Sequence, residues 1–234
     1  MGPIVDWITQ VLNFFYDITK SIGFPSYGLA IIFLTVVIKM LLYPLSLKQM
    51  RSLKITQQLQ PKIKELQERH KKDPQKAQAA MMELYKQYGA SPLSGCLPLL
   101  IQMPILIALY QALYKFDFAV KAHAGFLWIE SLKDPDRLFV MPVLAAVTTF
   151  ALQRMTSNTQ DPTQKTMLYA MPLFIGFITY KLPSGLGLYW VVTNIVGAIQ
   201  QYFINKQPLP VVVKEEGAKN EGSSKTRKND RGSN

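Results

Sequence analysis

A lysine in the middle of a long apolar run most constrains how this chain can fold. The run is GLAIIFLTVVIKMLLYPLSL, residues 28–47, and the lysine is Lys39. A helix of about 20 apolar residues is long enough to cross a hydrocarbon layer ~30 Å thick. Lys39 lies roughly 16 Å along such a helix from Gly28, and its side chain can bridge only part of that depth. Because a charge there costs about 2.5–3.5 kcal/mol even on a lenient scale, Lys39 predicts a polar partner or a water-filled cavity.

Four further apolar runs follow, so the sequence predicts an all-α polytopic membrane protein with five transmembrane helices. A soluble fold would have to bury five fully apolar helices in a chain of only 234 residues. That arrangement leaves too little amphipathic surface to cover them. The predicted transmembrane helices are residues 28–47, 95–114, 138–155, 167–182 and 185–204.

Basic residues are concentrated on one side of this predicted topology. Of the 26 Lys and Arg, 19 lie in 48–94, 154–166 and 205–234. The positive-inside rule makes these segments cytoplasmic, with the N-terminus outside and the C-terminus inside. The net charge of +11 is then explained by membrane topology, and we expect no direct nucleic-acid partner. The remaining segments are predicted as an extracytoplasmic loop (115–137), a cytoplasmic loop (156–166) and a basic disordered cytoplasmic tail (205–234).

Residues 3–20 predict an amphipathic helix outside the membrane core. Ile4, Ile8 and Leu12 recur at helical spacing, with Asp6 and Asn13 on the other face. Such a helix can lie flat in the outer membrane interface. It can equally pack against the outer loops of the bundle, and the sequence does not separate the two arrangements.

Residues 48–94 predict a cytoplasmic helical hairpin. Asp73 supplies an N-cap and Pro74 the first position of the second arm. Apolar stripes on the two arms are expected to be buried against each other or against a partner, which leaves a basic outer surface. That surface is either solvated and attracted to anionic lipids, or a docking surface for acidic partners or for emerging polypeptide.

Polar side chains within the predicted spans are candidates to surround Lys39. Thr35 lies one turn before it on the same face. Gln102, Gln153 and Asn194 fall at similar depths in other spans. Packing between membrane helices explains many such residues. It does not explain a mid-span lysine when the predicted spans contain no Asp or Glu to pair with it.

Catalytic and cofactor motifs are missing from the sequence. It contains no G-x-x-x-x-G-K-[ST], H-E-x-x-H or G-x-S-x-G pattern. Its single cysteine, Cys96, can form neither an internal disulfide nor a metal cluster. A serine–lysine hydrolase would need a serine beside Lys39, and the closest, Ser46, is about two turns away. We expect no enzymatic activity, no metal and no cofactor.

Three stretches of the chain resemble the YidC/Oxa/Alb family of membrane protein insertases, in its short Gram-positive-type form. They read QPKIKELQERHKKDPQKAQAAMMELYKQYGASPLSGCLPLLIQMPILIALYQAL, TQDPTQKTMLYAMP and LPSGLGLYWVVTNIVGAIQQYFI. Together with the run around Lys39 they cover nearly everything from Gly28 to Asn205. The resemblance implies five transmembrane helices around a hydrophilic groove that is closed to the outside and open to the cytoplasm and to lipid.

The resemblance also implies a function and a set of groove residues. The family's groove charge is usually an arginine, which Lys39 replaces, so the charge is kept while the planar fork of donors is lost. Expected partners are nascent membrane-protein clients, anionic lipids, and the ribosome and Sec translocon through the hairpin and tail. The expected location is the bacterial cell membrane. A small-solute transporter or a lipid scramblase is the alternative function. The expected groove residues are Lys39, Thr35, Gln102, Met103, Gln153, Trp190 and Asn194.

Overall fold

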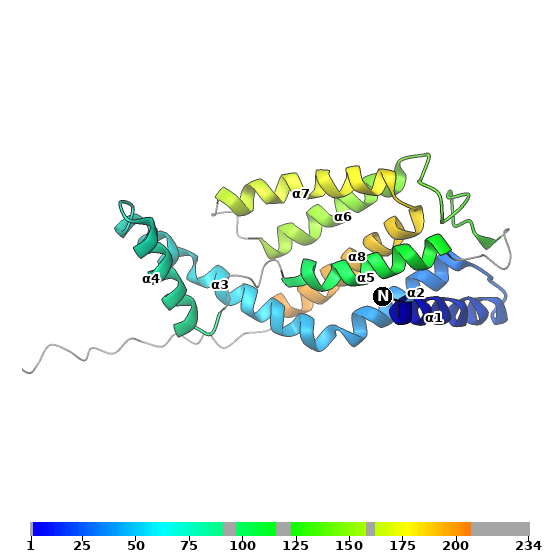
Figure 1. Ribbon diagram of the computed structural model, residues 1–234, viewed down its shortest axis with the longest axis horizontal. Helices are drawn as coiled ribbons and strands as arrows, with labels where there is room; N and C mark the ends of the chain where they lie inside the picture. Colours follow the sequence, from blue (N-terminus) through cyan, green and yellow to red (C-terminus); the bar gives the residue numbers. More distant parts are fainter. Residues whose placement is uncertain (1, 91–96, 116–122, 158–161, 207–234) are drawn as a thin grey trace, which may run out of the picture.

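The protein is an elongated helical bundle with a helical hairpin projecting from one end (Figure 1). This computed structural model describes residues 2–90, 97–115, 123–157 and 162–206. The predicted tail 205–234 lies almost entirely outside the described residues. The helices of the described residues are α1 (Gly2–Ser21), α2 (Tyr27–Leu41), α3 (Tyr43–Arg69), α4 (Pro74–Gln87), α5 (Leu97–Lys115), α6 (Val140–Thr156), α7 (Pro162–Lys181) and α8 (Ser184–Lys206).

The prediction of an all-helical protein is confirmed for these residues, while the number of membrane spans stays a prediction. None of the described helices is by itself both long and apolar enough to cross a membrane. The bent pair α2 and α3 meets the criterion when the two are taken together, and Leu100–Tyr114 and Val140–Thr156 are shorter apolar helices.

The predicted helix over residues 28–47 is broken near its end. α2 ends at Leu41 and α3 begins at Tyr43, with a bend of 63° between them. Pro44 stands in the first turn of α3. A proline cannot donate the helical hydrogen bond, and its ring collides with the carbonyl four residues earlier. Pro44 thus favours a new helix start at this position, and α3 leads directly into the hairpin.

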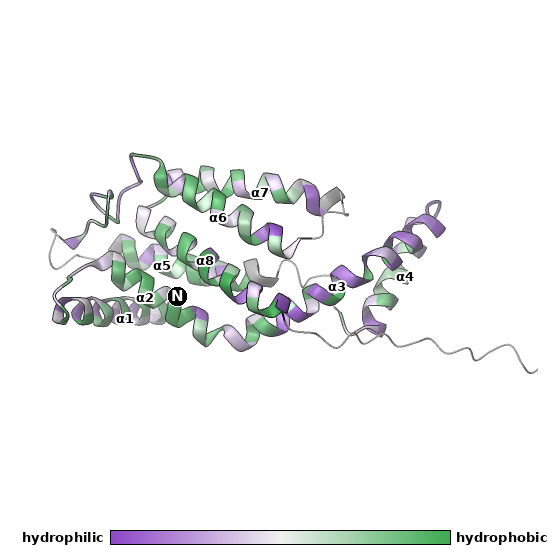
Figure 2. Ribbon diagram, turned by 180° about the vertical axis from the view of Figure 1, so that it is seen from behind, coloured by the Kyte–Doolittle hydropathy of each residue, from purple (hydrophilic) through white to green (hydrophobic). Residues whose placement is uncertain are grey.

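The α3–α4 hairpin is the most hydrophilic part of the described chain (Figure 2). Leu59 and Ile63 of α3 and Ala77 of α4 are its buried apolar residues. Asp73 caps α4 by accepting from the backbone amide of Lys76 at 3.1 Å, as the Asp-Pro pair predicts. Nearer the bundle, the side chain of Gln57 donates to the carbonyl of Thr156, which joins α3 to the end of α6.

The first helix packs along the bundle. Its buried face, which includes Ile8 and Leu12, lies against α2 and α5. The Tyr16 ring stacks on Tyr27 of α2 with centroids 3.9 Å apart. The Tyr16 hydroxyl is also 2.7 Å from His123 Nδ1 in the loop beyond α5. The opposite face of α1 exposes large apolar side chains such as Trp7. Its place in the membrane interface remains a prediction.

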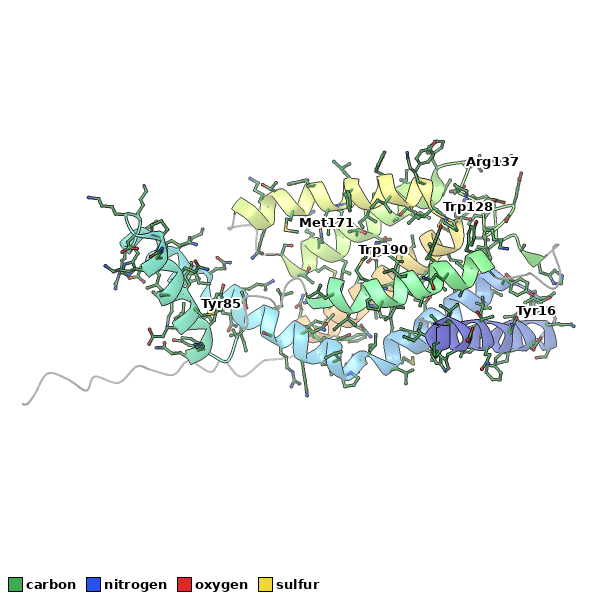
Figure 3. The ribbon with its side chains drawn as sticks, viewed as in Figure 1. Tyr16, Tyr85, Trp128, Arg137, Met171 and Trp190 are labelled. Atoms are coloured by element: carbon green, nitrogen blue, oxygen red, sulfur yellow. The ribbon has the colours of Figure 1, made fainter. Side chains whose placement is uncertain are left out.

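The loop before α6 caps the end of the bundle opposite the hairpin, where Trp128 and Arg137 are labelled in Figure 3. Asp136 is only 4% exposed. Its carboxylate accepts from the Trp128 indole at 3.2 Å and from the backbone amide of Met141 at 2.7 Å. The backbone amide of Gly185 at the start of α8 donates to the carbonyl of Leu132 at 3.0 Å. Hydrogen bonds thus fasten this loop to both α6 and α8.

Candidate functional site

Lys39 lies where α2 packs against α8. Its Nζ atom is 3.7 Å from the position that a Cβ would take at Gly197, so the missing side chain of this glycine makes room for the ammonium group. The Lys39 side chain is partly buried. Within the described part of the chain it has no hydrogen bond or ion pair. An ammonium group has three donors, and leaving them unpaired in a partly buried place is costly.

Unpaired acceptors belong to the same region of the bundle. The side-chain oxygens of Gln153, Gln200 and Gln201 are buried and have no partner. Gln200 and Gln201 follow Gly197 by one turn of α8. Gln153 follows Leu152, whose Cδ2 lies 3.2 Å from the Cβ position at Gly197. Because buried polar groups are almost always satisfied, this combination of unpaired donors and acceptors is typical of a place that takes up water or a polar ligand.

Two of the expected groove residues, Trp190 and Asn194 of α8, both contact Thr149 of α6. The Trp190 indole donates to the hydroxyl of Thr149 at 3.0 Å, and Trp190 lies near the middle of the bundle (Figure 3). The side-chain amide of Asn194 is 2.9 Å from the same hydroxyl and 3.2 Å from that of Thr148. Asn194 is 6% exposed. These contacts make a polar layer between α6 and α8, one turn from Gly197.

The other expected residues take different positions. Thr35 is fully buried on α2, and its hydroxyl donates to the carbonyl of Ile31 at 2.6 Å. Gln102 of α5 donates to the hydroxyl of Tyr189 on α8 at 2.5 Å. Met103 is 43% exposed on α5. Among the described residues, no hydrogen bond or ion pair joins Thr35, Gln102 or Met103 to Lys39, so their part in one groove stays a proposal.

Sequence reasoning missed several residues that the structure adds to the site. Gly197 faces the Lys39 ammonium, Thr149 binds both Trp190 and Asn194, and Tyr189 pairs with Gln102. The spacing of residues along α8 indicates which of them share a face with the expected site residues. Positions 190, 194, 197 and 201 recur at intervals of three and four residues, which puts them on one face of α8. Among the described residues, no group of His, Cys, Asp and Glu could hold a metal ion.

The described helices form a bundle that keeps a lysine and several amides between apolar helices, with a basic hairpin outside. The profile of the family described as 60Kd inner membrane protein matches residues 17–210. The chain therefore belongs to this family, which confirms the resemblance found in the sequence.

Individual relatives carry the name membrane protein insertase YidC. The chain is 43% identical to the protein of that name from Geobacter sulfurreducens over 196 residues, which is 83% of this chain but only 36% of the relative. It thus spans about a third of that protein's length. The Fusobacterium nucleatum protein of the same name is 38% identical over 208 residues, which is 88% of this chain and 99% of the relative.

A solved structure has a similar fold. It is the crystal structure of an active YidC insertase with its first transmembrane domain resolved. The TM-score is 0.68 and the sequence identity is 31%, and the match covers 85% of this chain and 46% of the other.

Proposed function

We propose that this protein is a membrane protein insertase that inserts and folds client membrane proteins. The observation that carries the proposal is the Lys39 ammonium, which lies beside Gly197 without a protein partner while three buried glutamine oxygens nearby are also unpaired. A resident ion pair would have satisfied the charge permanently. A charge without a carboxylate partner among the described residues can instead attract an acidic segment of another chain and release it again.

The physics of insertion explains why such a site is useful. A client's polar outer tail must cross ~30 Å of hydrocarbon, and each charged residue in it is costly there. A hydrated groove that reaches to Lys39 shortens the dry part of this path. The attraction between the ammonium and a client carboxylate also strengthens as the effective dielectric constant falls. The client's apolar helix then leaves sideways into lipid.

The proposed setting is the bacterial cell membrane, with the N-terminus outside and the C-terminus in the cytoplasm. The clients are nascent membrane proteins. The basic hairpin α3–α4 and the basic tail face the ribosome, a Sec translocon or anionic lipids. Attraction of clustered Lys and Arg to anionic headgroups or to acidic partners supports these assignments. In this proposal Thr35, Gln153 and Asn194 line the groove, and Met103 and Trp190 contact the apolar part of the client.

Insertion of a short single-span client with an acidic outer tail into liposomes containing this protein tests the proposal. Protease protection of the tail is compared for wild type, Lys39→Arg, Lys39→Ala and Lys39→Glu. The matched control is Lys48→Ala, which removes an exposed lysine nine residues further on. Wild type, Lys39→Arg and Lys48→Ala are expected to protect the tail, while Lys39→Ala and Lys39→Glu lose protection. Equal protection by all five proteins would rule out the electrostatic role of Lys39.

A small-solute transporter or a lipid scramblase remains the alternative, because an ionisable residue at mid-depth also occurs in transport proteins. The same liposomes separate the functions. Solute flux or lipid flipping without tail protection would favour the alternative, and tail protection without either favours the insertase.

A further inference from the structure

Helix α5 has two halves that differ in how they are held. After Pro104, the side chains of Ala108, Leu109, Ala112 and Leu113 are at most 1% exposed. Over residues 100–107 no described side chain is fully buried, and Leu100 is 62% exposed. The buried half lies at the end of α5 that adjoins α1 (Figure 1). Ile105 and Leu106 are partly buried and also pack against the core. Packing therefore holds α5 firmly after Pro104 and weakly before it.

One side-chain hydrogen bond ties the weakly packed half to the bundle. Gln102 donates to the Tyr189 hydroxyl at 2.5 Å. Within the described residues it is the single side-chain hydrogen bond made by 100–107. Tyr189 is 1% exposed, so its ring is fixed in the core of α8. Gln102 is the less buried partner of this pair.

Pro104 stands between the two halves. It lies inside α5 and cannot donate to the carbonyl of Leu100, so the helix lacks one of its own hydrogen bonds at this point. Kinks and bends in helices concentrate at such prolines. The weak point of the helix thus lies about one turn before Ala108, the first buried side chain that the structure describes in α5.

We propose that the first half of α5 is a hinged wall, which the Gln102–Tyr189 hydrogen bond holds against α8 and which swings at Pro104 to let an apolar segment leave into lipid. The hinge at Pro104 and the Gln102–Tyr189 hydrogen bond do not depend on any client protein. The identity of the passing segment, a client transmembrane helix, rests on the proposed insertase function. The segment displaces Gln102 from Tyr189 as it passes, and the hydrogen bond re-forms afterwards.

Distance measurements between spin labels test the hinge without any client. In a Cys96→Ser background, labels at Leu100 and Ile199 report on the proposed moving half, and labels at Tyr114 and Ile199 on the fixed half; all three side chains are exposed. Tyr189→Phe and Gln102→Leu each remove one side of the latch. Both are expected to lengthen and broaden the 100–199 distance distribution and to leave 114–199 unchanged. Adding Pro104→Ala, which restores the helical hydrogen bond, should narrow the 100–199 distribution again.

Two results would overturn the hinge: an unchanged 100–199 distribution in both latch variants, or an equal change in the 114–199 control. Client insertion is then measured on the same variants. We expect Tyr189→Phe to raise the rate of tail protection and Pro104→Ala to lower it. If the distances change as expected while Lys39→Ala inserts as well as wild type, the hinge stands and the electrostatic role of Lys39 fails.

Discussion

The Trp190 indole and the Thr149 hydroxyl join α8 to α6 by a hydrogen bond of 3.0 Å. The Thr149 hydroxyl itself donates to the carbonyl of Ala145 at 2.6 Å. Its proton is thus already used, which leaves its lone pairs free to accept from Trp190. The Asn194 amide lies 2.9 Å from the same hydroxyl. With its oxygen turned toward the cluster, this amide accepts from the Trp190 indole and from the backbone amide of Thr149, each at 3.2 Å. We favour this orientation because in the other one the amide nitrogen faces these two N–H donors.

Replacing Thr149 by valine should destabilise the bundle. The substitution keeps the shape of the side chain and removes the hydroxyl that accepts from Trp190 and contacts Asn194. An unpaired buried donor costs about 1–3 kcal/mol, so we expect a loss of that size in the free energy of unfolding, measured by denaturant titration in detergent micelles. Thr149→Ser keeps the hydroxyl and should behave like wild type. Equal stability of Val and Ser would mean that water readily replaces the hydroxyl.

This cluster shows what sequence reasoning can and cannot reach. Asn194 was predicted as a site residue because a polar side chain inside an apolar helix is unusual, and Trp190 because it matches an aromatic position of the insertase family that the chain resembles. Thr149 was not predicted, because a threonine in a helix can satisfy its hydroxyl on the carbonyl four residues earlier, as Thr149 does on Ala145. Helical spacing gives the face of α8 that carries the polar residues. Which helix that face meets depends on tertiary packing, which one sequence does not contain.

Gly28 illustrates a close contact that the sequence does not reveal. A Cβ at this position would lie 2.7 Å from Phe126 Cβ and still closer to Cγ and Cδ2 of the ring. Gly28→Ala should therefore push the loop containing Phe126 away from α2. Overpacking typically costs about 1–3 kcal/mol, to be measured as a lower free energy of unfolding.

A double-mutant cycle checks that Phe126 is the cause. Phe126→Ala removes the ring atoms and should restore much of the stability lost in Gly28→Ala, giving a coupling energy of about 0.5–3 kcal/mol. If the two changes simply add, the contact does not limit the packing of α2 against the loop.

Local signals were more reliable than long apolar runs. The Asp73–Pro74 pair predicted the start of α4, and this is confirmed. The run 28–47 was predicted as one helix because its composition is apolar throughout. Pro44 is a local signal against that reading, since proline is tolerated in the first turn of a helix and disturbs a helix interior. The bend at Leu42 follows from this local rule, whereas its angle is set by the packing of α3.

The cap on α4 should make the hairpin sensitive to acid. The backbone amide of Lys76, together with its side chain, lowers the pKa of Asp73. Because the folded pKa lies below the unfolded value, the cap stabilises α4 fully above the usual Asp pKa of about 3.9 and is lost as the pH falls through the folded pKa. The Lys76 amide chemical shift, followed by NMR, should titrate below this usual value. It should not titrate in Asp73→Asn. A midpoint at or above the ordinary Asp value would contradict the cap.

Gly197 should determine how well the Lys39 ammonium is accommodated. Alanine adds a methyl group 3.7 Å from Nζ and 3.2 Å from Leu152 Cδ2. The contact with Nζ is ordinary, and Leu152 has to shift only slightly. Alanine also improves helix propensity by up to about 1 kcal/mol, so Gly197→Ala should insert clients like wild type and be no less stable. Leucine at this position places apolar atoms against the ammonium group, which should reduce client insertion toward the level of Lys39→Ala.

The exposed neighbour Ile199 provides the matched control for this change. Ile199→Leu alters a side chain that is 52% exposed on the same helix, and it should leave insertion unchanged. Insertion is measured by protease protection of the client tail, and correct folding of each variant by its far-UV circular dichroism. Gly197→Leu combined with Lys39→Ala should insert no worse than Lys39→Ala alone, because both changes act on the same ammonium group. A clearly additive loss would show that Gly197 supports insertion by a route independent of Lys39.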